Sequence, residues 1–127
     1  MLRVCVSSIL RFHAFSLAEQ LQRQGCLERL LISWFNPKTI AKGYDIDTKL
    51  VRKNILFFGL DRLPHKVPGL KRFAADCQWQ AAEWYDRWAA WKVPECDVFV
   101  GWSSYSLRAM RRAKKRGAVT VLERGST

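Results

Sequence analysis

The chain lacks the residue clusters that most often carry metal or cofactor chemistry. Its four cysteines stand far apart, at positions 5, 26, 77 and 96, and no histidine lies beside one, whereas a zinc site needs closer spacing. No Gly-x-Gly-x-x-Gly or Gly-Lys-Ser/Thr phosphate motif occurs. We therefore expect no metal and no resident cofactor, and we interpret the cysteines as buried thiols in a reducing compartment.

Long hydrophobic runs and acidic residues are also scarce. The first apolar stretch, residues 4–10, contains two serines and ends at Arg11, so it is too short to span a membrane and is a poor signal peptide. We expect a cytoplasmic protein, with peripheral contact with a membrane left open. The 22 lysines and arginines against 11 acidic residues give a formal net charge of +11. This excess indicates anionic partners: phosphorylated ligands, nucleic acid or an anionic membrane face.

The residues that are present alternate between strand and helix patterns. Residues 98–100 form an apolar run that ends at Gly101, positions 107, 110 and 113 repeat at helical spacing as far as Gly117, and residues 119–122 form a second β-rich run. The opening third repeats this plan, with strands predicted at 2–6 and 30–32 around a helix that ends at Gly25. Parallel strands need such helical connections, so both units predict an α/β domain.

Between these two units the chain predicts a long loop, a third strand and a long helix. Residues 36–53 are polar and weakly periodic, as in a loop, and residues 55–58 are the candidate strand, although four successive apolar residues also fit a helix turn. The helix is predicted from Gly69 to about Trp91, because apolar residues recur there at intervals of three and four: Leu70, Phe73, Cys77, Ala81, Trp84, Trp88 and Trp91. We interpret this stripe as core packing, in preference to a surface that stacks on a sugar or a base. Trp79 is the only helix tryptophan expected to be exposed.

The complete order predicts one domain with a Rossmann-like, doubly wound parallel sheet of about five strands, in the order 3-2-1-4-5, with helices on both faces. Ligands of such sheets bind where the strand order reverses, here between the first and fourth strands, at their carboxyl ends. The residues predicted to line that cleft are Ser7, Ser8, Arg11, Phe12, His13, Trp102, Ser103, Ser104, Arg124, Gly125, Ser126 and Thr127. Their hydroxyls and arginines, near the free amides of helix amino termini, suit a phosphate or polyol ligand. Two alternatives stay open, since Ser103 and Ser104 could merely cap a helix and His13 could be a surface residue.

A dense basic run occupies the helix before Gly117. Its members are Arg108, Arg111, Arg112, Lys114, Lys115 and Arg116. A solvated helix face, with cations near the negative end of the helix dipole, is the default interpretation. Adsorption to an anionic membrane surface is the alternative, since each basic residue near such a surface contributes about 1 kcal/mol. No aromatic residues are interleaved with these charges, so nucleic acid is a less favoured partner than lipid.

Two segments resemble a known enzyme family. The first, at 11–25, reads RFHAFSLAEQLQRQG and is similar to the first helix of the family-4 glycosyltransferases of the GT-B fold. The second reads CDVFVGWSSYSLRAM at 96–110 and RGAVTVLERGST at 116–127. It is similar to the segment that leads into the active-site cleft of that family.

The resemblance implies an enzyme of two Rossmann-like domains. The amino-terminal domain receives the acceptor, the carboxyl-terminal one binds a nucleotide sugar, and the sugar is transferred with retention of configuration and without a required metal. On this resemblance the chain is the acceptor-binding half, with the cleft lined by Arg11 to His13, Ser103, Ser104 and Arg124 to Thr127. Its expected partners are the absent donor domain and a sugar or lipid acceptor, and no catalytic activity is expected of this half alone.

A different class of function remains as the alternative. The same domain could be a non-catalytic Rossmann-like module that binds a phosphorylated ligand or a partner protein. Half of an enzyme should expose apolar surface that its missing domain covers, and it should therefore dimerise or aggregate. A stable monomer would favour the module.

Overall fold

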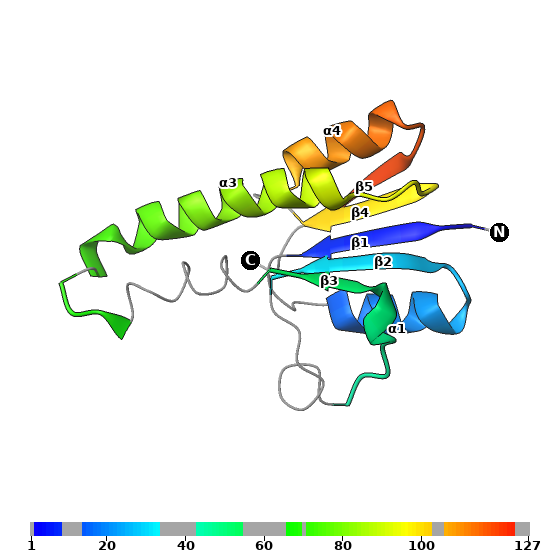
Figure 1. The fold of residues 1–127 in the computed structure, drawn as a ribbon, viewed down its shortest axis with the longest axis horizontal. Coiled ribbons are helices and arrows are strands. Elements are labelled where there is room, and N and C mark those ends of the chain that lie inside the picture. Colours follow the sequence, from blue (N-terminus) through cyan, green and yellow to red (C-terminus); the bar gives the residue numbers. More distant parts are fainter. Residues whose placement is uncertain are drawn as a thin grey trace.

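Five parallel strands form the centre of the structure (Figure 1). The computed structural model describes residues 2–8, 14–33, 43–54, 66–69, 71–102 and 106–123. The strands are β1 (Val4–Ser8), β2 (Leu27–Ile32), β3 (Val51–Lys53), β4 (Val98–Trp102) and β5 (Val119–Glu123). They pair in the order β3-β2-β1-β4-β5. The predicted fold class and strand order are confirmed.

Helices cover both faces of this sheet. The helix α1 (Ala14–Arg23) packs on one face, and α3 (Ala74–Lys92) and α4 (Leu107–Lys115) lie together on the other (Figure 1). Short 3-10 turns, η1 (Thr48–Leu50) and η2 (Lys71–Phe73), precede β3 and α3. Right-handed crossovers explain the two layers, because the chain moves outward from β1 to β2 and in the opposite direction from β4 to β5. Gly25 and Gly117, with φ of 73° and 91°, provide the predicted left-handed ends of α1 and α4.

The core is built from whole strands and from small residues on the helices. Each residue of β1 is buried, as a central parallel strand requires. The two helices on the α3 side contribute mainly alanine to the core. The buried apolar residues of these two helices are Ala81, Tyr85, Ala89, Ala109 and Ala113.

The predicted core stripe is wrong for Phe73, Trp84 and Trp91, which are exposed, and Leu70 lies outside the described residues. The buried side of α3 is the neighbouring stripe that carries Tyr85, and Trp88 is half-buried with its ring centroid 5.6 Å from that of Tyr85. Trp79 is exposed as predicted, but it is not alone in this. The exposed indole rings lie on the side of α3 opposite Tyr85, whose hydroxyl bonds to Leu31 of β2.

The predicted loop at 36–53 is wrong at its carboxyl end, where η1 and β3 lie. Residues 51–53 pair in register with Leu30, Leu31 and Ile32 of β2. A three-residue edge strand with two cations has no apolar run, and charge on edge strands is common because it discourages further pairing. The candidate strand at 55–58 and residues 36–42 lie outside the described residues.

Three smaller predictions also change. Gly101 lies within β4 instead of ending it, and α3 begins at Ala74 after η2 instead of at Gly69. In α4, Leu107 is exposed, whereas Ala109 is buried in its place. Each shift reflects packing between distant segments, which local periodicity does not record.

Candidate functional site

The candidate site is the carboxyl edge of the sheet, where β1 and β4 lie side by side. Ser7 of β1 is in register with Gly101 of β4 on one side and with Leu31 of β2 on the other. The chain leaves β1 toward one face and β4 toward the other, so the strand order reverses here, and this is where doubly wound sheets bind ligands. The first half of α3 extends beyond this edge (Figure 1).

Three of the predicted site residues are described by the structure, and it brings them together. Ser7 and Ser8 end β1, Trp102 ends β4, and all three are buried. The other predicted site residues lie outside the described residues: Arg11, Phe12, His13, Ser103, Ser104, Arg124, Gly125, Ser126 and Thr127.

Ser7 is hydrogen-bonded inside the protein. Its Oγ lies 2.9 Å from the hydroxyl of Tyr85, and that hydroxyl donates to the carbonyl of Leu31 at 2.7 Å. Since the single phenolic proton goes to Leu31, Ser7 donates to Tyr85. These bonds give Ser7 a structural role, in which Tyr85 ties α3 to β1 and β2. The sequence contained one signal for Tyr85, its position four residues from both Ala81 and Ala89.

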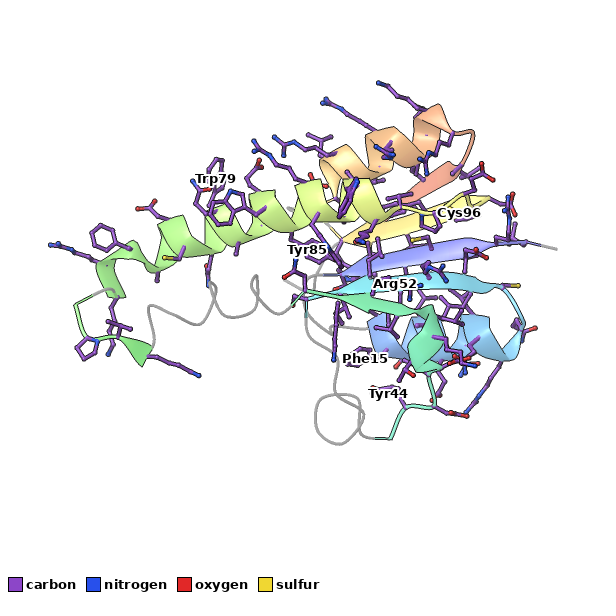
Figure 2. All side chains as sticks on the ribbon, in the orientation of Figure 1. Phe15, Tyr44, Arg52, Trp79, Tyr85 and Cys96 are labelled. Carbon is purple, nitrogen blue, oxygen red and sulfur yellow. The ribbon has the colours of Figure 1, made fainter. Side chains whose placement is uncertain are left out.

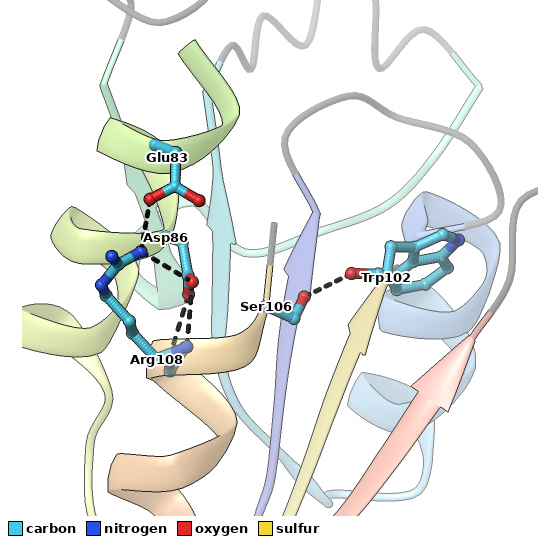
Figure 3. Close-up of polar contacts among 6 residues, drawn as sticks. Glu83, Asp86, Trp102, Ser106 and Arg108 are labelled. Atoms are coloured by element: carbon cyan, nitrogen blue, oxygen red, sulfur yellow. Dashed lines mark hydrogen bonds and ion pairs between the residues drawn. The ribbon is translucent and has the colours of Figure 1, made fainter. Parts of the chain in front are cut away.

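The amino terminus of α4 is capped by an acidic residue from α3. Ser106, at the cap position, makes no capping bond, and its hydroxyl donates to the carbonyl of Trp102 at 2.6 Å. The buried carboxylate of Asp86 accepts the amides of Arg108 and Ala109 at 2.9 and 3.0 Å (Figure 3). A carboxylate is favoured there by the helix dipole. These two amides are occupied, so the expectation that the amides at this helix start are free for an anionic ligand is wrong for them.

Arg108 is neutralised by two acidic side chains of α3. Its Nη1 lies 2.7 Å from Oε2 of Glu83 and 3.8 Å from Oδ2 of Asp86 (Figure 3). The guanidinium of Arg116 donates to the carbonyl of Val93 at 2.8 Å. The basic run predicted from the sequence therefore does not act as one cluster, because two of its members hold α4 in place.

Gly101 allows Ser106, at the start of α4, to pack on β4. A Cβ atom at this position would lie 2.5 Å from Oγ and 2.7 Å from Cβ of Ser106, closer than real side chains approach. Any larger residue would push Ser106 away from the carbonyl of Trp102. Glycine is thus needed here for close approach, beside the candidate site.

Cys5 and Cys96 are buried, as predicted, whereas Cys26 and Cys77 are half-buried, so the prediction of buried thiols is wrong for those two. Burial raises the pKa of Cys5 well above the ordinary value of 9.0, and burial raises that of Cys96 as well. Both thiols are free and stay protonated at neutral pH. Within the described ranges, no three His, Cys, Asp or Glu side chains are grouped to hold a metal ion. None of the described helices is both long enough and apolar enough to cross a lipid bilayer.

Comparisons with known proteins return no match, whether with protein-family models, with curated proteins or with solved structures. The functional argument therefore rests on the residues of this chain and on their arrangement.

Proposed function

We propose that this chain is the acceptor-binding, amino-terminal half of a retaining glycosyltransferase of the GT-B class, which transfers a sugar from a nucleotide-sugar donor. The observation that carries the proposal is the position of the two segments that resemble this family. Residues 11–25 include α1, and residues 96–127 include β4, α4 and β5. The two segments flank the point where the strand order reverses, so their loops start from adjacent strands at one edge.

The chemistry of those loops supports the same proposal. Sugar transfer needs hydroxyl groups to bind the acceptor and positive charge beside the departing diphosphate. Arg11 and His13 follow β1, Ser103 and Ser104 follow β4, and Arg124 follows β5 in the sequence. In this proposal the serines bind the acceptor, the cations stabilise developing negative charge, and the donor domain supplies the nucleotide sugar.

The outer edge of the sheet also favours half of a larger enzyme. The edge strand β5 leaves Val119 and Leu122 exposed to 64% and 53%. Exposed apolar edge strands invite further pairing. Such an edge supports a sheet that continues in the complete enzyme, whereas a free-standing binding module would be expected to cover or charge it.

The test compares the 127-residue chain with the product of the complete reading frame. Both are incubated with radiolabelled UDP- and GDP-sugars and with extracted lipid and polysaccharide acceptors, and the anomeric configuration of any product is determined by NMR. We expect transfer with retention by the complete protein and none by the chain alone. Transfer by the chain alone, or inversion by the complete protein, would refute the proposal. A reading frame that ends at Thr127, together with a stable monomer, would favour the alternative of a non-catalytic module.

Variants separate the proposed cleft from the rest of the surface. In the complete protein, Arg124→Ala should lower kcat/KM on the order of a hundredfold, because it removes a charge that stabilises the transition state. Arg23→Ala, at the exposed end of α1, is the control that should leave kcat/KM unchanged. Equal effects of the two substitutions would contradict the assignment of Arg124 to the cleft.

A further inference from the structure

We propose that the outer side of α3 and α4 is a docking surface for an anionic lipid membrane. The inference is independent of the reaction proposed above. Two features of this surface carry it: a groove lined by cations, and three exposed tryptophans on the adjacent helix.

The basic groove lies between α3 and α4 and has a volume of about 340 Å³. Its lining residues are Ala90, Arg108, Arg111, Arg112 and Lys115. The four cations stand at positions i, i+3, i+4 and i+7, which form one face of α4. Arg108 is already neutralised by Glu83 and Asp86.

The other three cations of the groove are uncompensated. In the part of the chain that the structure describes, no carboxylate lies within ion-pair distance of Arg111, Arg112 or Lys115. The helix dipole accounts for a cation in the last turn, such as Lys115, but not for Arg111. Three unpaired charges around one groove suit the phosphate groups of anionic lipids.

The exposed tryptophans lie on the outer side of α3. Trp79, Trp84 and Trp91 are exposed to 61%, 51% and 69%. At about 100° per residue, the three side chains cover an arc of roughly 140° around the helix axis, and the middle of this arc lies opposite Tyr85. Along the axis they extend over about 18 Å. Figure 2 shows Trp79 on the side of α3 away from the sheet and Tyr85 on the side toward it. Indole rings favour the boundary between lipid headgroups and acyl chains, whereas three of them facing water are unusual.

The separation of the tryptophans from the groove cations favours a membrane over nucleic acid. The three tryptophans are on α3 and the three uncompensated cations are on α4, although one cation of α3, Lys92, lies 4.4 Å from the ring centroid of Trp91. Single-stranded nucleic acid is bound where aromatic rings alternate with cations along one path. An interfacial surface places apolar rings at the acyl boundary and cations against lipid phosphates. The formal net charge of +11 would attract the chain to such a surface.

The test measures co-sedimentation of the 127-residue chain with two kinds of vesicle. One kind is phosphatidylcholine alone, and the other contains about one third phosphatidylglycerol, which supplies the negative surface potential. The groove variant is Arg111→Gln/Arg112→Gln/Lys115→Gln. The matched control, Lys49→Gln/Lys66→Gln/Lys114→Gln, removes the same charge from exposed lysines outside the groove.

We expect the wild type and the control to bind the anionic vesicles, and the groove variant to bind on the order of a hundredfold more weakly. Equal binding to both vesicle types, or equal loss in the groove variant and the control, would overturn the proposal. So would binding to inorganic phosphate or to single-stranded nucleic acid at the same salt concentration without binding to vesicles. If circular dichroism shows that the groove variant is unfolded, the variant Arg111→Lys/Arg112→Lys replaces it, because it keeps the positive charge. Loss of vesicle binding by this second variant would also overturn the electrostatic argument.

Tryptophan fluorescence tests the second feature independently. Brominated lipid in the anionic vesicles should quench the wild-type emission, because the exposed rings lie at the interface. The double variant Trp84→Ala/Trp91→Ala should bind the anionic vesicles about tenfold more weakly, since it removes two indole rings that would contact the lipid. Unchanged emission on binding, or unchanged affinity of this variant, would exclude the tryptophans from the docking surface.

Discussion

Removal of the Asp86 carboxylate tests the arrangement that holds α4 beside the candidate site. Asp86→Ala deletes the acceptor of two amides, those of Arg108 and Ala109, and leaves them without this partner inside the protein. Loss of a helix cap costs about 0.5–2 kcal/mol, and stranding a buried polar group costs about 1–3 kcal/mol. We therefore expect the free energy of unfolding to fall by about 3 kcal/mol, a large part of the ~5–15 kcal/mol typical of a domain.

Urea unfolding followed by far-ultraviolet circular dichroism measures this loss, and two variants serve as controls. Arg108→Ala keeps the backbone amides but removes the ion pairs with Glu83 and Asp86. Because those pairs are partly exposed, it should cost only about 0.2–1 kcal/mol, as should Glu83→Ala. Asp86→Asn keeps one acceptor oxygen, so its loss in the free energy of unfolding should lie between the losses of Arg108→Ala and Asp86→Ala. If Arg108→Ala costs as much as Asp86→Ala, the carboxylate acts through the ion pair and the capping argument is refuted.

Three further substitutions test the packing around the site by the same unfolding measurement. Tyr85→Phe removes the hydroxyl that donates to Leu31 and should cost about 1–3 kcal/mol; wild-type stability would contradict the buried network. Gly101→Ala should cost about 1–3 kcal/mol, because the new Cβ would lie 2.5 Å from Oγ of Ser106, and a neutral effect would mean that Ser106 can move freely. Burial holds the pKa of the Cys5 thiol above its ordinary 9.0. The contribution of this thiol to the free energy of unfolding is therefore present below about pH 9 and is lost as the pH rises toward the raised pKa. Cys5→Ala should flatten the alkaline decline in stability, and equal slopes for both proteins would refute this cause.

The strand order could be predicted because central parallel strands leave a clear local signal. β1, β4 and the second half of β2 are buried on both faces and read as short apolar runs, and the handedness of the crossovers then limits the topology. β3 left no such signal, since two of its three residues are cations and its position depends on pairing with β2. An edge strand of this length is specified by its partner, not by its own residues.

The site was harder to predict because its described contacts join distant residues. Asp86 lies 22 residues before Arg108 in the sequence and belongs to α3, but it caps the amino terminus of α4. Ser7 meets Tyr85 over 78 residues, and no local pattern records this contact. Local patterns identify residues capable of polar contact, but only the packing of α3 decides which of them remain free.

Three consecutive residues of α3 explain why its tryptophans face outward. Trp84, Tyr85 and Asp86 point about 100° apart, toward the outside, the sheet and α4 respectively. A rotation of α3 that buried Trp84 would gain about 1.5–3 kcal/mol from its apolar surface. It would also turn Tyr85 away from Leu31 and withdraw Asp86 from α4, and each stranded polar contact costs about 1–3 kcal/mol. The polar contacts outweigh the buried indole, so the orientation that assembles the candidate site is also the one that leaves the tryptophans exposed on the outer side of α3.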